Sequence, residues 1–365
     1  MCGIAGMQTT SGQAPSMTVL NAMSDALTHR GPDGEGSFVS GATGLMQTRL
    51  AIIDLETGDQ PLFDDEGLAL VANGEIYNYL ELRRELGEAG FKTHSDCEPP
   101  LKLYRRDGVR FADALRGMYA IALYDPDGER LMLTRDPFGI KPLYYAETGH
   151  GFIFASEPQA LLATGLVSPE MNSSAIGELL QLQFTTGRET AYKTICRVLP
   201  GETLVIERGR VLERHRRHAL PAEGPRPQSE EHAIVMLEDA LIDSVRVHQR
   251  SDVPYGMFLS GGIDSTAIAA LVMPTAVAAI LKSPGAGPKK AIVLAVGIVI
   301  AMLIANRNSP ENLNLGQFFG MMNIPTAIIL PILAILLVTG EWSQRTALTT
   351  FTLEPRRQRV VGAKL

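Results

Sequence analysis

The residue of this chain best suited to chemistry is a cysteine at the second position. Removal of Met1 would leave Cys2 with a thiol and a free α-amino group on one residue. A thiol is an intrinsically strong nucleophile, and an α-amine titrates near about 7.7–8.0, so it can take the thiol proton without a histidine. Cys2 therefore predicts a nucleophile that carries its own base. The alternative is a buried free cysteine, a common state of this residue.

Five further segments follow this start in a fixed order. With the start, the six segments are Met1–Gly6 (MCGIAG), His29–Gly34 (HRGPDG), Arg49–Asp54 (RLAIID), Asn73–Asn78 (NGEIYN), Ser95–Glu98 (SDCE) and Arg135–Tyr145 (RDPFGIKPLYY). Together they resemble the class II glutamine amidotransferases, whose nucleophile is an N-terminal cysteine. The Ser260–Ser265 run (SGGIDS) further along narrows the resemblance to the glutamine-hydrolysing asparagine synthetase family, over residues 1 to about 271.

The resemblance implies a role for each of five residues around the thiol. Arg49 is the clamp on the glutamine α-carboxylate, for which a planar guanidinium suits bidentate bonding. Asp96, helped by Glu75, faces the glutamine α-ammonium. Asn73 and Gly74 form the oxyanion hole, with the side-chain amide of one and the backbone N–H of the other as donors. Such preorganised donors are worth about 3–4 kcal/mol each in the transition state.

Each of these residues also has a plainer interpretation when it is taken alone. Asn-Gly is a common hairpin turn, which would place Asn73 and Gly74 at a loop tip. Arg49 alone would be a solvated surface charge. Asp96 alone could cap the N-terminus of a helix that carries Leu101 and Leu103. The order and spacing of the whole set favour the glutaminase site over these alternatives.

The elements that must position the site belong to a sheet-rich first domain, residues 2–215. Turn residues and apolar runs predict paired strands, and apolar spacing predicts helices. The resemblance implies an α/β fold of the α+β kind, an N-terminal-nucleophile αββα sandwich. The predicted elements are strands at 68–72, 118–124 and 130–134, a turn at 125–128, a second hairpin at 148–151, a helix at 16–28 with Ser16 as its cap, and a helix at 77–90 closed by Gly90.

A second region follows a proline-containing linker at residues 216–231. A helix is predicted at 230–248 and a strand at 253–259, directly before the glycine-rich turn. The resemblance implies that residues 232–271 are the start of a doubly wound ATP-pyrophosphatase unit. Such a turn points backbone N–H groups at one place, and the next helix adds its positive end. By resemblance, this turn holds the phosphates of ATP with Mg²⁺ while aspartate is adenylated. Its residues are Ser260, Gly261, Gly262, Asp264 and Ser265.

Residues 272–365 do not match this family. Two apolar runs, 291–305 and 318–338, stand where an acidic nucleotide- and aspartate-binding domain is expected, and about 20 apolar residues cross a bilayer. Basic residues flank both ends of the pair, which favours a membrane hairpin with both ends in the cytoplasm. The alternatives are two buried helices in a globular core, and a tail joined from an unrelated membrane protein.

The composition of the chain limits the binding partners and the cellular compartment that we expect for it. The net charge is −7, of which residues 266–365 carry +6 and the remaining 265 residues −13. An acidic body argues against nucleic acid as a partner. Three cysteines without paired spacing and the lack of a signal peptide indicate the cytoplasm. The chain has no CxxC or HExxH motif, so no metal site is expected among its own motifs. A homodimer is compatible with the family.

We therefore expect an amidotransferase that resembles asparagine synthetase. The family reaction converts ATP, aspartate and glutamine to asparagine, glutamate, AMP and pyrophosphate. Glutamine hydrolysis at Cys2 is the part that the residues support, and the synthetase half reads as incomplete. The alternative from another class is an inactive fragment that acts at most as a glutamine-binding module.

Overall fold

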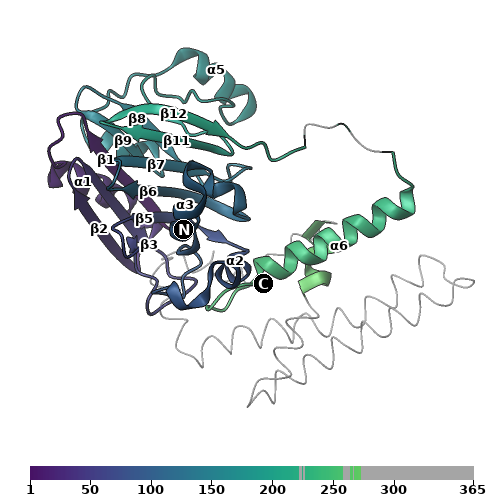
Figure 1. Ribbon diagram of the computed structural model, residues 1–365. Helices are drawn as coiled ribbons and strands as arrows, with labels where there is room; N and C mark the ends of the chain where they lie inside the picture. Colours follow the sequence, from purple (N-terminus) through teal and green to yellow (C-terminus); the bar gives the residue numbers. More distant parts are fainter. Residues whose placement is uncertain (222–223, 225–226, 258–263, 266, 273–365) are drawn as a thin grey trace, which may run out of the picture. The chain divides into compact units, whose positions relative to one another are not determined.

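The computed structural model describes residues 1–221, 224, 227–257, 264–265 and 267–272. These residues contain two six-stranded sheets in which all neighbouring strands are antiparallel (Figure 1). The first sheet runs in the order β10 (Cys196–Arg197), β8 (Tyr144–Glu147), β9 (Gly151–Ala155), β1 (Gly3–Thr9), β3 (Thr43–Arg49) and β2 (Gly34–Ser40). The second runs β12 (Arg210–Arg216), β11 (Glu202–Glu207), β7 (Arg130–Arg135), β6 (Gly117–Asp125), β5 (Ala69–Ile76) and β4 (Leu62–Phe63).

The helices of the first domain cover the outer faces of the two sheets, which gives four layers. Helices α1 (Met17–Leu27) and α4 (Pro158–Ala163) pack on the first sheet. Helices α2 (Tyr79–Leu86) and α3 (Pro99–Asp107) pack on the second, together with the 3₁₀ helix Gly108–Ala114. The remaining helices are α5 (Ser173–Leu182), α6 (Glu230–His248) and two 3₁₀ turns, Thr28–Arg30 and Glu88–Gly90.

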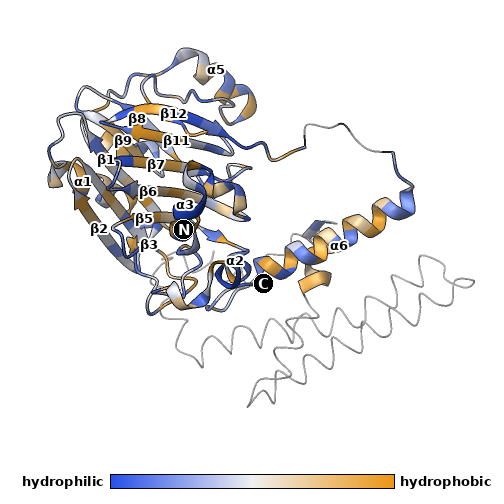
Figure 2. Ribbon diagram, in the orientation of Figure 1, coloured by the Kyte–Doolittle hydropathy of each residue, from blue (hydrophilic) through white to orange (hydrophobic). Residues whose placement is uncertain are grey.

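The core explains why the central strands read as continuous apolar runs. Successive side chains of a strand point to opposite faces, so a strand buried on both faces is apolar throughout. In β6, Ala120 and Ala122 pack between the sheets, whereas Ile121 and Leu123 pack against the helices. Figure 2 shows this hydrophobic colouring along the central strands. The predicted strands at 68–72, 118–124 and 130–134 are confirmed as β5, β6 and β7.

Of two helices predicted in the first domain, one has the expected ends and the other ends earlier than expected. The helix at 16–28 is confirmed as α1; Ser16 occupies the cap position, although its side chain makes no capping bond. The helix predicted to close at Gly90 instead ends at Leu86, and Gly87 follows with a φ of 87°. A glycine adopts such a positive φ at no steric cost, so the first of the two glycines ends the helix.

The predicted helix at 230–248 is confirmed as α6, whose N-terminus is capped by Ser229 Oγ at 3.3 Å from the His232 N–H. The strand predicted at 253–259 is wrong for its described part, because residues 253–257 are not strand. A strand needs a neighbour for its backbone hydrogen bonds, and the described residues after 217 offer none. Residues 258–259 lie outside the described part of the chain.

The predicted tail, residues 272–365, lies almost entirely outside the residues that the structure describes. Among the described residues there is no helix long and apolar enough to cross a membrane. The two apolar runs, 291–305 and 318–338, do not belong to that set, and the hairpin remains a prediction from sequence. Contacts group Met1–Ile268 into one compact unit.

Candidate functional site

The six residues predicted for glutamine chemistry line one cavity of about 360 Å³. Cys2 comes from the start of β1 and Arg49 from the end of β3, the strand paired with it. The other walls come from the end of β5 and from the loop before α3. The residues that the sequence placed here are Cys2, Arg49, Asn73, Gly74, Glu75 and Asp96, and others in the lining include Gln47, Gln60, Cys97 and Lys141.

Cys2 directly precedes β1 and lies beside Leu50, the residue that directly follows β3. Its Sγ lies 3.3 Å from the Leu50 nitrogen and 3.5 Å from the Leu50 oxygen. Burial lowers the pKa of the α-amine, here still on Met1, and the cations Arg30 and Lys141 lower it further. Removal of Met1 would place the free amine on Cys2, one residue further along the chain. A lowered pKa keeps more of the amine neutral, as a base must be.

Arg30 contacts the residue that carries the thiol, although the sequence assigned Arg30 no role. Its Nε donates a hydrogen bond to the Cys2 carbonyl oxygen at 2.9 Å, and its Nη1 bonds to Glu157 at 2.6 Å. Arg30 is buried, and this bond ties its guanidinium to the backbone of Cys2. The recognised segment His29–Gly34 was the available signal, but its pattern does not show which atom the guanidinium contacts.

Asn73 and Gly74 lie inside β5 and not at a hairpin tip, which excludes the turn interpretation. A Cβ on Gly74 would come within 2.6 Å of the Met118 oxygen and 2.8 Å of the Tyr119 Cα. The close approach of β6 therefore requires glycine at this position.

Two hydrogen-bond donors of β5, one from Asn73 and one from Gly74, belong to residues that line the cavity with Cys2. Among the described residues, the Asn73 Nδ2 is buried and has no hydrogen-bond partner. The N–H groups of Ala72 and Ile76 donate to Gln60 Oε1 and Asp96 Oδ2 on the edge of β5 away from β6. Alternate residues of a strand share an edge, so the Gly74 N–H lies between them and toward the cavity. Buried donors without partners are costly unless a ligand completes them.

Arg49 is a buried residue rather than a solvated surface charge. It is 7% exposed, and its Nη1 bonds to Asp59 Oδ1 at 2.5 Å. Its Nη2 donates to the carbonyl oxygens of Ile53 and Asp54. The turn that follows β3 thus folds back and holds the guanidinium at the cavity wall, where a carboxylate could reach its remaining N–H groups.

Asp96 is buried beneath the cavity and accepts a hydrogen bond from the Ile76 N–H at 2.7 Å. Glu98 occupies the cap position of α3, so the helix-cap interpretation of Asp96 is wrong. Burial raises the pKa of Asp96 to about 7, and the charge of Glu75 contributes in the same direction. An α-ammonium bound between these two carboxylates would favour the ionised form. Burial also raises the pKa of the neighbouring Cys97 thiol well above its ordinary value.

The raised pKa of Asp96 predicts a pH-dependent affinity for glutamine. Below about pH 7 the carboxyl is protonated and no longer pairs with the α-ammonium, so the KM for glutamine should rise about tenfold per pH unit. In the unfolded chain the carboxyl of Asp96 ionises near about pH 3.9. The folded form of the free protein therefore keeps a proton that the unfolded form loses, and the free energy of unfolding should fall as the pH rises from about 4 to 7. Steady-state kinetics and melting curves across pH 5.5–8.5 check both; a KM independent of pH would contradict the assignment.

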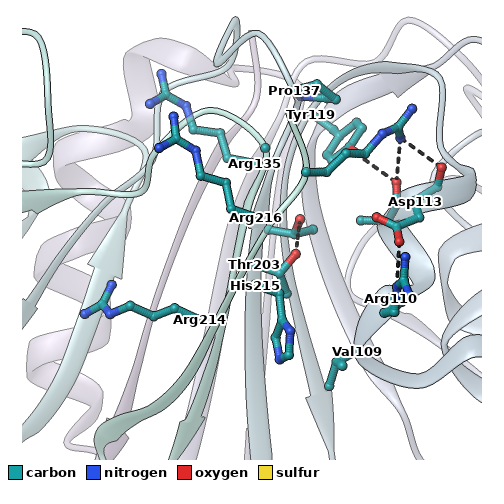
Figure 3. A pocket seen from close by; sticks show the side chains of 14 residues that line it. Val109, Arg110, Asp113, Tyr119, Arg135, Pro137, Thr203, Arg214, His215 and Arg216 are labelled. Carbon is teal, nitrogen blue, oxygen red and sulfur yellow. Dashed lines mark hydrogen bonds and ion pairs between the residues drawn. The ribbon is translucent and has the colours of Figure 1, made fainter. Parts of the chain in front are cut away.

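A second and larger cavity, of about 600 Å³, lies on the other side of β6 from β5, between the 3₁₀ helix Gly108–Ala114 and β12 (Figure 3). Arginines dominate its lining, and several of them are hydrogen-bonded to other groups of the domain. Arg217 donates to backbone carbonyls that include Asp113 at 2.9 Å, and Arg110 pairs with the Asp113 carboxylate at 2.8 Å. Arg135 donates from all three nitrogens to carbonyls. These contacts brace the fold, and none of the six predicted glutamine residues lies there.

The predicted phosphate loop is mostly outside the described residues. Asp264 and Ser265 are described and helical, whereas Ser260, Gly261 and Gly262 are not described. The described part of the chain therefore offers no geometry for ATP or Mg²⁺. No group of three or more His, Cys, Asp or Glu side chains in that part could hold a metal ion.

Comparison with known proteins identifies the family of the first domain. A sequence model of the glutamine amidotransferase domain matches residues 1–216. The chain belongs to the glutamine amidotransferase family. The resemblance carried by the six segments is thereby confirmed. A model of asparagine synthase matches residues 236–281 of this amidotransferase, a region that opens within α6.

Curated relatives agree with both matches. The amidotransferase is 38% identical to glutamine-hydrolysing asparagine synthetase 1 of Bacillus subtilis over 275 residues, which cover 73% of this chain and 43% of the relative. It is 36% identical to asparagine synthetase 2 of the same organism, over 74% of this chain and 38% of the relative. The amidase chry2 of Gibberella zeae is 33% identical. The chain thus spans less than half the length of these relatives.

Among solved structures, a glutamine phosphoribosylpyrophosphate amidotransferase of B. subtilis matches with a TM-score of 0.45 and 22% identity. The match covers 59% of this chain and 49% of that one.

Proposed function

We propose that this amidotransferase hydrolyses glutamine to glutamate and ammonia at Cys2. The observation that supports the proposal is that one cavity is lined by the Cys2 thiol and by two residues with hydrogen-bond donors, Asn73 and Gly74. The buried guanidinium of Arg49 and the buried carboxyl group of Asp96 line the same cavity. Asp96 and Glu75 would take the α-ammonium, and Arg49 the α-carboxylate. This leaves the side-chain amide of glutamine toward Cys2. The four-layer arrangement with the nucleophile at the start of a central strand supports the N-terminal-nucleophile fold class.

The reaction that this geometry allows has two stages. The Cys2 α-amine takes the thiol proton, and Sγ attacks the amide carbon of glutamine. The oxyanion that forms accepts hydrogen bonds from Asn73 Nδ2 and the Gly74 N–H. The C–N bond then breaks, the amine returns its proton to the leaving nitrogen, and ammonia departs from a thioester. Water, deprotonated by the same amine, cleaves the thioester to glutamate and restores the thiol.

A second proposal concerns the ammonia. The relatives are named for asparagine synthesis, so we infer that the family uses the released ammonia to amidate aspartate, with ATP as the co-substrate and Mg²⁺ as the accompanying metal ion. Because only residues 236–281 match the synthase model, we assign glutamine hydrolysis, and not synthesis, to the residues described here. Aspartate-dependent exchange of pyrophosphate into ATP should stay at background.

The deciding experiment measures glutamate and ammonia released by the purified protein, after intact mass has shown that Met1 is absent. The matched control carries a short N-terminal extension, which converts the Cys2 amine into an amide. The processed protein should turn over and the extended one should not. A glutamine-binding module would bind glutamine in both forms and release ammonia in neither, which would overturn the proposal.

A further inference from the structure

Residues just after α6 contact the loop that holds the glutamine clamp, although they lie about 200 positions further along the chain. The Asp252 Oδ2 accepts a hydrogen bond from the Asp54 N–H at 2.7 Å. The Asp252 N–H donates to the Ile52 oxygen at 3.0 Å. One residue thus bonds both ends of the three-residue turn Ile52–Asp54, once through its side chain and once through its backbone.

Neighbouring residues anchor the same segment on the site side of the first domain. Arg250 forms a bidentate ion pair with Glu81, with nitrogen–oxygen distances of 2.7 and 2.9 Å. Its guanidinium also donates a hydrogen bond to the Tyr77 carbonyl oxygen. The His248 ring lies 4.2 Å from the Tyr77 ring. Tyr77 directly follows β5, the strand that carries Asn73 and Gly74.

The Ile52–Asp54 turn holds the guanidinium of Arg49. The carbonyl oxygens of Ile53 and Asp54 both accept from Arg49 Nη2. Asp54 adopts a φ of 55°, a conformation that non-glycine residues rarely hold without support. Its carboxylate binds the Thr57 N–H at 2.9 Å and the His94 N–H at 2.8 Å, and Asp252 secures its backbone N–H. The position of the clamp therefore depends on a turn that is supported from both sides.

We propose that Asp252 is a positioning residue for glutamine: it fixes the Ile52–Asp54 turn, and through it the orientation of Arg49 toward the glutamine α-carboxylate. This inference rests on the proposed hydrolysis of glutamine. Asp252 lies in the region matched by the asparagine synthase model, so a residue of that region completes the binding site of the amidotransferase domain. Asp252 does not line the cavity, and its effect passes through Arg49.

The test compares Asp252→Ala with the parent on two substrates. One is glutamine, and the other is 4-aminobutanamide, which is glutamine without its α-carboxylate. Loss of Asp252 should raise the KM for glutamine about tenfold and leave kcat within about twofold. For 4-aminobutanamide, kcat/KM should stay within about twofold, since Arg49 has no carboxylate to bind. Asp252→Asn retains an acceptor oxygen for the Asp54 N–H and should restore the KM for glutamine to within about twofold of the parent.

Ser251→Ala is the matched control, because the Ser251 hydroxyl bonds only within its own segment, to Val253; its kinetics should match the parent. An unchanged KM in Asp252→Ala, or an equal loss on both substrates, would overturn the inference. Should the alanine variant not fold, Asp252→Ser serves in the same comparison. A parent protein that does not hydrolyse glutamine would instead refute the proposed function, so the two failures are distinguishable.

Discussion

Replacing Cys2 by alanine is expected to lower glutamine hydrolysis by at least about 10³-fold, to the background of the assay. The thiol is the only group at the start of β1 that can form the thioester, and a catalytic unit that has lost its nucleophile retains little activity. The fold should survive, because Cys2 is only half-buried and, in the described part of the chain, its Sγ hydrogen bonds are to the Leu50 backbone. Ammonia release and melting temperature, measured on the same preparation, check both statements.

Cys196→Ala is the matched control for this variant. Cys196 is also half-buried and free, but it lies in β10 at the edge of the first sheet and does not line the glutamine cavity. Its removal should leave hydrolysis within about twofold of the parent. Retained activity in Cys2→Ala would show that another nucleophile or a contaminant performs the reaction, and the mechanism assigned to Cys2 would fall with it.

The sequence predicted the convergence of the glutamine site because the site follows the sheets. Cys2 directly precedes β1 and Arg49 ends β3, and the antiparallel pairing of these strands places Gly3 opposite Thr48. Asn73, inside β5, carries its donor on a strand of the facing sheet. Short motifs at strand ends are local in sequence, and strand pairing brings such ends together. Motif order was therefore a sufficient guide to these residues.

Other features depend on contacts that no local pattern records. The bond between Asp252 and Asp54 spans 198 positions, and neither residue type signals it. Arg30 stood in a recognised segment, yet its bond to the Cys2 carbonyl is a matter of side-chain direction. The end of α2 at Gly87 rather than Gly90 reflects a choice between two glycines that spacing alone does not make. Helix ends and long-range hydrogen bonds are decided by tertiary structure.

Replacing Asn73 by alanine is the second change with a large expected effect: kcat should fall about 10²–10³-fold, with the KM for glutamine within about threefold. The amide can stabilise only the charge that develops on the attacked oxygen, and loss of one such donor costs this much in rate. Because Nδ2 has no partner in the described structure, its loss breaks no bond of the free protein. Stability should therefore change little, since the buried amide was itself unsatisfied.

Asn73→Asp sharpens this prediction. The carboxylate has nearly the shape of the amide but replaces a donor with an acceptor, so it should repel the oxyanion and reduce kcat at least as far as alanine does. Steady-state kinetics on both variants, with alkylation of Cys2 by iodoacetamide as a measure of thiol reactivity, separate the possible causes. A raised KM with unchanged kcat would place Asn73 among the substrate-binding residues instead. A loss of alkylation in parallel with kcat would mean that Asn73 acts on the thiol, because a donor reserved for the oxyanion leaves the attacking sulfur unchanged.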